Sequence, residues 1–177
     1  GLMTAASFEA ALKKAKARRL RPRVVLPVHL SGHAAAIEEI ADIAEREGLA
    51  VVEDACHAIG SQVRVGDAWR PVGACDRSAM AVFSFHPVKT IACGEGGAVT
   101  TRDPALAKRL KRLRSHGMVR DAGEMSNPSL SLDADGAANP WSYEMPDIGF
   151  NYRQTDIQSA LGLSQLRKLE HFKARRA

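Results

Sequence analysis

The sequence is poor in cysteine, in aromatic residues and in long apolar runs, and each shortage argues against a class of protein. The three cysteines lie far apart and form no CxxC pair, which argues against a disulfide scaffold or a zinc site and suits a reducing cytoplasm. No apolar run is long enough to cross a bilayer. Aromatic residues make up only 5% of the chain and do not alternate with basic residues, so a base-stacking surface for nucleic acid is not expected.

Positive charge is in excess. The formal net charge is +5, and most of the excess lies in runs with a helical pattern at residues 13–23, 108–114 and 167–176. We interpret these runs as solvated helix faces. The alternative is a basic nucleic-acid-binding domain that uses the helix of residues 108–114. The length of 177 residues allows one domain with a hydrophobic core.

Helical and strand-like patterns alternate along the chain. Asp103 before Pro104 is a helix start signal, and a capping box at Thr155 and Gln158 is another. Residues 119–147 are irregular, and a loop of that length is usually functional or mobile. The patterns predict helices at residues 7–18 and 35–47 and after positions 103 and 155, and strands at 24–28, 49–53, 79–85 and 97–101. This order predicts an α/β fold, with a mostly parallel sheet and helices on both faces.

Ligands of such sheets bind beyond the carboxyl ends of the strands, here residues 27–32, 54–60 and 84–89. Asp54 ends one of these strands and Lys89 follows another. An acid and a lysine in one crevice are what pyridoxal 5′-phosphate (PLP) requires, because an amine holds the cofactor and a carboxylate keeps its pyridine nitrogen protonated. Taken singly, Asp54 is equally consistent with a turn or helix cap, and Lys89 with a solvated side chain.

Four strings make the pattern far more specific. The stretch from Val24 to Phe172 resembles the DegT/DnrJ/EryC1/StrS family of sugar aminotransferases. The strings are VVEDACHAIG at residues 51–60, FSFHPVK at 83–89, GEGG at 94–97 and GFNYR at 149–153. The resemblance implies the type I fold of PLP-dependent aminotransferases and makes residues 1–177 a central part of the PLP-binding large domain. The family's amino-terminal phosphate-binding segment and its carboxy-terminal small domain have no counterpart here, so we expect this chain alone to bind PLP poorly.

The resemblance also assigns roles to single residues. Lys89 matches the catalytic Schiff-base lysine, which also carries protons, and Asp54 matches the partner of the pyridine nitrogen. Asn151 matches a residue that reaches the cofactor phosphate of a neighbouring subunit, which implies a homodimer with shared sites. The remaining candidates are His57 at the cofactor ring, Ser84 at its phosphate, and His29, Tyr152 and Arg153 as substrate contacts.

Within the family, several strings resemble the enzymes that aminate C4 of a UDP-linked 4-keto-6-deoxy-N-acetylhexosamine, including the transaminase of pseudaminic acid biosynthesis. These strings are PVH at residues 27–29, FSFHPVK at 83–89, PWSYEM at 140–145 and GLSQL at 162–166. The expected amino donor is glutamate. The alternatives are another nucleotide-sugar or carbon position, or an inactive subunit that contributes only Asn151 to a partner. Lys89 argues against a dehydratase of the family, in which a histidine replaces the lysine.

A metal site is not expected. The spacing of His29, His33 and His116 matches no known zinc pattern, and Asp133 and Asp135 lack the rest of a calcium loop. Trp141 and Tyr143 either contact a sugar or uracil ring or anchor the long loop, and the sequence does not separate these two roles.

Overall fold

The computed structural model describes residues 1–137 and 139–176. The chain forms two compact units, one of residues 1–103 with the segment from Gln154 onward, and one of Pro104–Arg153. The first unit contains α1 (Ala5–Ala17), β1 (Val24–Val25), α2 (Ile37–Arg46), β2 (Ala50–Asp54), β3 (Gln62–Val65), β4 (Ala68–Pro71), β5 (Met80–Ser84), β6 (Gly97–Thr100), α4 (Asp156–Leu166) and α5 (Leu169–Arg176). The second contains α3 (Pro104–Leu113) and two short 3-10 helices, Ala122–Glu124 and Pro128–Leu130.

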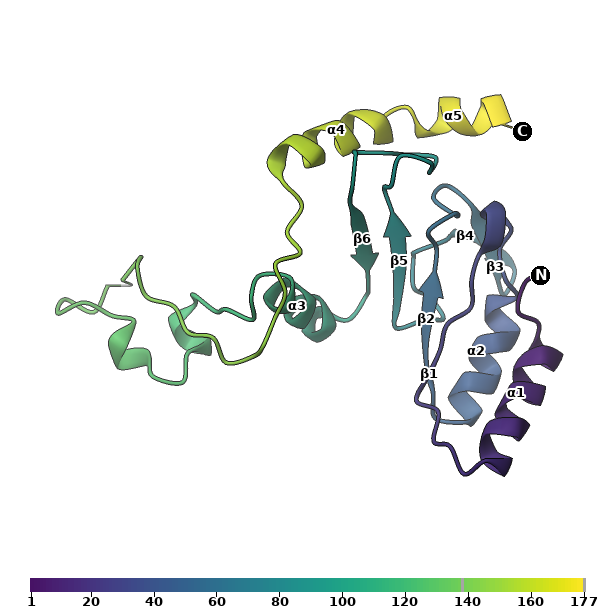
Figure 1. Cartoon of the computed structure of the whole chain (residues 1–177), viewed down its shortest axis with the longest axis horizontal. Coiled ribbons are helices and arrows are strands. Elements are labelled where there is room, and N and C mark those ends of the chain that lie inside the picture. Colours follow the sequence, from purple (N-terminus) through teal and green to yellow (C-terminus); the bar gives the residue numbers. More distant parts are fainter. Residues whose placement is uncertain (138, 177) are drawn as a thin grey trace. The chain divides into compact units, whose positions relative to one another are not determined.

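The main sheet has the strand order β1-β2-β5-β6 (Figure 1). The first three strands are parallel, with Val25 beside Val51 and Asp54 beside Val82. Only β6, at the edge, runs antiparallel to β5. The predicted α/β class with a mostly parallel sheet is therefore confirmed, and the ends of β2 and β5 open at the same edge of the sheet.

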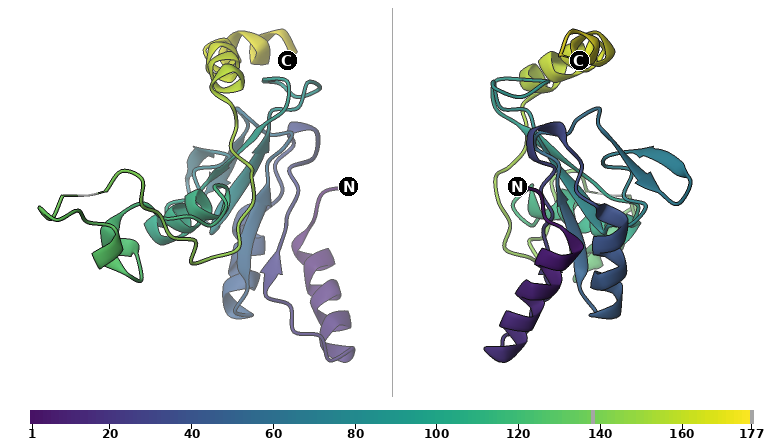
Figure 2. Two further views of the ribbon diagram at one scale, coloured as in Figure 1. Left: turned by 60° about the vertical axis from the view of Figure 1, so that its left-hand side comes forward. Right: turned by 90° about the vertical axis from the view of Figure 1, so that its right-hand side faces the viewer.

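The hydrophobic core lies between this sheet and the helices α1 and α2, which lie side by side (Figures 1 and 2). α2 turns Ile37, Ile40 and Ile43 inward, and all three are buried. β2 and β5 contribute Val51, Ala81 and Phe83 from the facing side. Alternate residues of both strands are buried, so the residues that end them are only partly covered and lie at the edge of the core.

A hairpin of β3 and β4 stands apart from the main sheet and was not predicted. Its strands pair antiparallel, with Val65 opposite Ala68. Gly66 and Asp67 form the turn between them, and the amide of Gly66 donates to the Glu38 carboxylate. Every residue of β4 is exposed, so no apolar alternation marked this strand, whereas β3 does alternate and buries Val63.

In the second unit, the segment after α3 is tied into a compact arrangement. Arg112 of α3 donates to Asp147 across 2.9 Å and to Glu124 across 3.2 Å. Val119 and Glu144 exchange two backbone hydrogen bonds of 2.8 and 3.1 Å. The irregular stretch predicted at residues 119–147 is thus held by one guanidinium and by backbone pairing.

The capping box at Thr155 forms as predicted, with its hydroxyl accepting from the Gln158 amide at 3.2 Å. The predicted last helix is interrupted and continues as the separate α5. α4 exposes several large apolar side chains, among them Ile157, Leu161 and Leu163. Among the described residues, no helix combines the length and the apolar character that a membrane crossing requires.

Candidate active site

The ends of β2 and β5 bring two of the predicted site segments together. Asp54 is the last residue of β2 and Ser84 is the last residue of β5, and the two strands are hydrogen-bonded neighbours. Lys89 follows in a turn that its own amide closes on the carbonyl of His86 at 2.9 Å. The glycine-rich segment behind the lysine approaches β5 closely, since a Cβ at Gly97 would lie 2.6 Å from the Phe83 carbonyl oxygen.

Asp54 is the acid at this edge of the sheet. Partial burial raises the pKa of its carboxyl, but hydrogen bonds from Cys56 and two neighbouring positive charges outweigh the burial and hold the pKa below its ordinary value. The amide of Cys56 donates to Asp54 Oδ1 at 3.1 Å. The two groups are Lys89 and His57, the latter only when its ring is protonated. Asp54 is therefore ionised at neutral pH, with the Lys89 amine close enough to act on it.

Lys89 is half-buried, and within the described residues its amine makes no hydrogen bond or ion pair. Its charge also acts on the thiol of Cys56. Burial first and Asp54 second raise the pKa of that thiol, and Lys89 counteracts them. Both effects indicate that the Lys89 amine lies within electrostatic range of the Asp54 carboxylate and the Cys56 thiol.

The side chains of His57 and Ser84 lie beside this pair. His57 is exposed, and its Nδ1 accepts from the Ser31 amide at 3.3 Å, so the proton of the neutral ring is on Nε2. The Ser84 hydroxyl accepts from the His86 amide at 3.3 Å and keeps its own hydrogen for another acceptor. Both residues can therefore donate a hydrogen bond to a ligand.

His29 is placed differently from the expected substrate contact. Its side chain is fully enclosed, with 0% exposure. Nε2 lies 2.7 Å from Glu53 Oε2, and Nδ1 accepts from the Ala35 amide at 3.0 Å. Ser78 donates to the other oxygen of Glu53. With both ring nitrogens engaged, His29 has nothing left to offer a ligand in this conformation, and the geometry favours a structural role beneath Asp54.

This buried network was not predicted. In the alternation of the strand at residues 49–53, Glu53 takes an inward-facing position, and a carboxylate there requires partners. That alternation was the signal that could have found it.

The other predicted residues belong to the second unit. Asn151 forms a backbone bridge with Ser115, and the Tyr152 amide donates to the Arg114 carbonyl at 2.9 Å. Tyr152 stacks on Phe150 with ring centroids 4.8 Å apart. The side chains of Asn151, Tyr152 and Arg153 are exposed, as are those of Trp141 and Tyr143. The exposure of Trp141, 85%, does not favour its role as a packing anchor.

The helix α5 contacts the segments that follow β2 and β5. Arg176 donates to the Thr90 hydroxyl at 2.7 Å, directly after Lys89. Lys173 and Leu169 approach Gly60 at the end of the loop that begins with Asp54. Both segments therefore contact one helix.

The residues present fit PLP. An ionised, half-buried carboxylate suits a pyridinium nitrogen, and an amine without a fixed partner suits attachment of the cofactor. Ser84 supplies a hydroxyl donor suited to a phosphate oxygen. In the part of the chain that the structure describes, no group of three or more His, Cys, Asp or Glu side chains forms a metal site.

Comparisons with known proteins point the same way. The DegT/DnrJ/EryC1/StrS aminotransferase family matches residues 2–177. Among solved structures, an aminotransferase of Helicobacter pylori involved in pseudaminic acid biosynthesis, PseC, is 32% identical with a TM-score of 0.70, over 91% of this chain and 37% of its own. A family member from Brucella abortus is 35% identical with a TM-score of 0.72, over 96% of this chain and 39% of its own.

A third structure, DesI in the presence of its TDP-sugar product, is 29% identical with a TM-score of 0.69. It covers 97% of this chain and 35% of its own. The chain thus spans well under half the length of each of these three relatives.

Proposed function

Because the chain belongs to the DegT/DnrJ/EryC1/StrS aminotransferase family, we propose that it carries the cofactor-binding centre of a PLP-dependent sugar aminotransferase. Residues 1–177 are assigned to a central part of the PLP-binding large domain. The observation that carries the proposal is the ionised carboxylate of Asp54 at the end of β2, with the charge of Lys89 acting on it from beyond the end of β5.

Each residue of the crevice has a task in this proposal. Lys89 attaches the cofactor through Nζ and then moves a proton between the carbon atoms that exchange the amino group. The Asp54 carboxylate would keep the pyridine nitrogen of the cofactor protonated. His57 orients the ring from its exposed side, and the Ser84 hydroxyl binds the phosphate. PLP supplies the electron sink that makes the amino group transferable.

The substrate assignment is a finer proposal. We assign the amino acceptor as a UDP-linked 4-keto-6-deoxy-N-acetylhexosamine aminated at C4, with glutamate as donor, as in pseudaminic acid biosynthesis. The similarity to PseC at 32% identity supports it. The similarity to DesI, a protein solved with a TDP-sugar product, supports the alternative of another nucleotide-sugar.

A homodimer with shared sites is part of the proposal. Ile157 on α4 and Ile148 before Asn151 are 84% and 92% exposed. Large apolar side chains at such exposure favour burial against further protein. Asn151 is also exposed, as a residue that reaches a neighbouring subunit must be. We place the enzyme in the cytoplasm, in keeping with its free cysteines.

The test uses the intact enzyme that contains this chain and a panel of UDP- and dTDP-linked keto-sugars with glutamate. Lys89→Ala is expected to abolish turnover on every sugar. Asp54→Ala is expected to lower kcat by about a hundredfold or more, because the electron sink loses its counter-charge. The sugar that is aminated, and the carbon that receives nitrogen, decide the finer assignment.

Lys168→Ala is the matched control, since Lys168 lies between α4 and α5 and is exposed. It is expected to leave turnover unchanged. Retained turnover in Lys89→Ala would refute the role of the lysine. The chain of residues 1–177 alone is expected to give only a weak visible band with PLP, and a full-strength band contradicts that expectation.

A further inference from the structure

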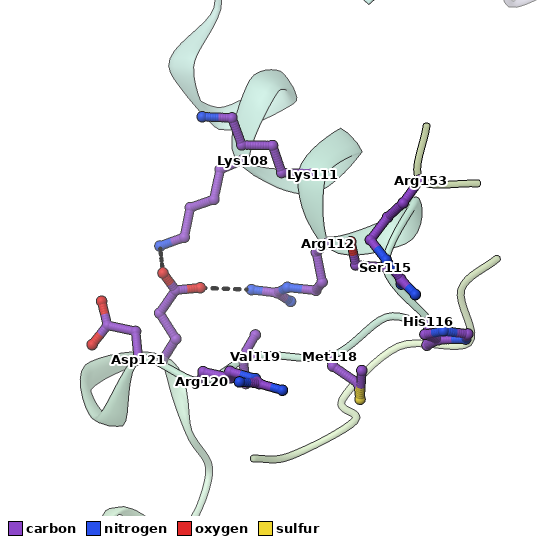
Figure 3. Close-up of a pocket in the computed structure, with 11 residues that line it drawn as sticks. Lys108, Lys111, Arg112, Ser115, His116, Met118, Val119, Arg120, Asp121 and Arg153 are labelled. Carbon is purple, nitrogen blue, oxygen red and sulfur yellow. Dashed lines mark hydrogen bonds and ion pairs between the residues drawn. The ribbon is translucent and has the colours of Figure 1, made fainter. Parts of the chain in front are cut away.

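A second, strongly cationic pocket lies in the other unit, wholly within Pro104–Arg153 (Figure 3). It has a volume of about 640 Å³, within the range of small-molecule sites. α3 forms one wall, the segment after α3 forms the floor, and Arg153 approaches from the strand-like segment that returns along α3.

Two of its cations are already neutralised. Lys108 lies 2.9 Å from Glu124 Oε1 and Arg112 lies 3.2 Å from Oε2 of the same carboxylate. The dashed lines in Figure 3 mark these pairs. Arg112 also binds Asp147 at 2.9 Å. These contacts fix the wall of the pocket and leave little charge there for a ligand.

Three further cationic side chains line the pocket and are not paired with a carboxylate. Lys111, Arg120 and Arg153 are exposed, and among the described residues their side chains form no hydrogen bond or ion pair. They come from α3, from the segment that follows it, and from the returning segment. Three like charges around one cavity repel one another, and an anion between them removes that repulsion. The Nε atom of Arg112 is in addition buried without an acceptor.

We propose that this pocket binds the diphosphate group of a small molecule, with Lys111, Arg120 and Arg153 contacting its oxygens. A diphosphate presents several anionic oxygens to separate cations at once, and guanidinium groups bind such oxygens in pairs. The Asp121 and Glu124 carboxylates at the rim disfavour an extended nucleic-acid backbone, which would have to pass them. That the diphosphate belongs to a nucleotide-linked sugar rests on the proposed function, whereas binding of the anion does not.

Calorimetric titration of the chain with pyrophosphate at low ionic strength tests the proposal, because screening is then weak. The double variant Lys111→Gln with Arg120→Gln removes two charges at positions without partners, so the fold is not expected to change. Its affinity for pyrophosphate is expected to fall by about a hundredfold, since each lost charge-assisted contact is worth about a factor of ten. UDP is expected to bind the same site and to compete with pyrophosphate.

The control variant Lys14→Gln with Arg18→Gln removes the same net charge from the exposed side of α1. An equal loss in both double variants, or no loss in the pocket variant, overturns the proposal. Binding of a short DNA duplex that pyrophosphate does not displace also overturns it and assigns the charge to nucleic acid. PLP binding and turnover are separate readouts, so pyrophosphate binding that survives in an enzyme without aminotransferase activity refutes the proposed function alone.

Discussion

Nε2 of His29 lies 2.7 Å from Oε2 of Glu53, and both side chains are buried. Because the Ala35 amide donates to Nδ1, the ring proton lies on Nε2 and the pair is a neutral imidazole bound to a carboxylate. The backbone amide of His29 also donates to the carbonyl of Asp54 at 2.9 Å. The network thus connects the segment after β1 to the residue that carries the negative charge of the crevice.

Removal of Glu53 should therefore destabilise the first unit and disturb Asp54. We expect Glu53→Ala to lower the free energy of unfolding by about 3–5 kcal/mol, because the ring of His29 and the hydroxyl of Ser78 lose their acceptor in a buried place. Urea unfolding followed by far-UV circular dichroism measures the change. Glu53→Gln keeps one acceptor oxygen and should cost less, and an unchanged midpoint for Glu53→Ala would contradict the network.

Gly117 lies in the turn that follows α3, against the returning chain at Asp147. Its φ is +75°, and a Cβ there would lie 1.9 Å from the Asp147 carbonyl oxygen. Gly117→Ala must therefore displace the backbone at Asp147, whereas Gly136→Ala, with φ +78° and nothing within 4 Å, adds only the strain of the left-handed conformation. We expect a loss of about 1 kcal/mol at Gly136 and clearly more at Gly117. Hydrogen exchange at the amides of His116 and Phe150, which bridge the two segments, reports the difference, and equal protection in both variants would refute it.

The carboxylate of Glu144 makes the stability of the second unit depend on pH. The amides of Ser126 and Asn127 donate to it at 2.6 and 2.7 Å, and these hydrogen bonds hold the pKa of Glu144 below its ordinary value. A group whose pKa is lower in the folded state stabilises that state above the unfolded pKa of about 4.3 and loses this effect as the pH falls through the folded pKa. We expect the amide NMR signals of Ser126 and Asn127 to titrate together below the ordinary glutamate range, because the pKa of Glu144 is lowered. Glu144→Gln should abolish that titration, and a midpoint above the ordinary glutamate range would show the sign to be wrong.

The elements with strong local patterns were predictable from the sequence. The helices that became α1, α2 and α3, and the strands that became β2, β5 and β6, lie within a few residues of their expected places. The strand expected at residues 24–28 is shorter, at Val24–Val25, because Pro27 lacks an amide for the ladder. β4 was missed because it is exposed throughout, and β3 because its alternation spans only four residues.

Contacts between distant residues were not predictable, because periodicity contains no information on which side chains meet. The link from Arg112 to Asp147 and the pairing of His29 with Glu53 both join segments far apart in the chain. The positions of Asp54 and Ser84, the last residues of β2 and β5, at one sheet edge did follow from the sequence, since neighbouring parallel strands end at the same side. The features that follow from sheet topology could therefore be predicted from the sequence, whereas the side-chain contacts that depend on tertiary packing could not.

The thiol of Cys56 reports on that shared edge without any cofactor. Burial and then the Asp54 carboxylate raise its pKa, and the Lys89 amine lowers it. Alkylation requires the thiolate, so Asp54→Asn should speed the reaction of Cys56 with iodoacetamide and Lys89→Gln should slow it, each by about two- to tenfold near pH 7.5. Peptide mass mapping separates Cys56 from the buried Cys75 and Cys93.

Opposite responses to the two substitutions require that both charges face one thiol, which a lysine on a separate surface cannot produce. Lys14→Gln, a charge change of the same size on α1, should leave the rate unchanged. If Lys89→Gln behaves like Lys14→Gln, the amine does not reach the crevice in solution. In that case the role of Lys89 would have to be abandoned before any assay of turnover.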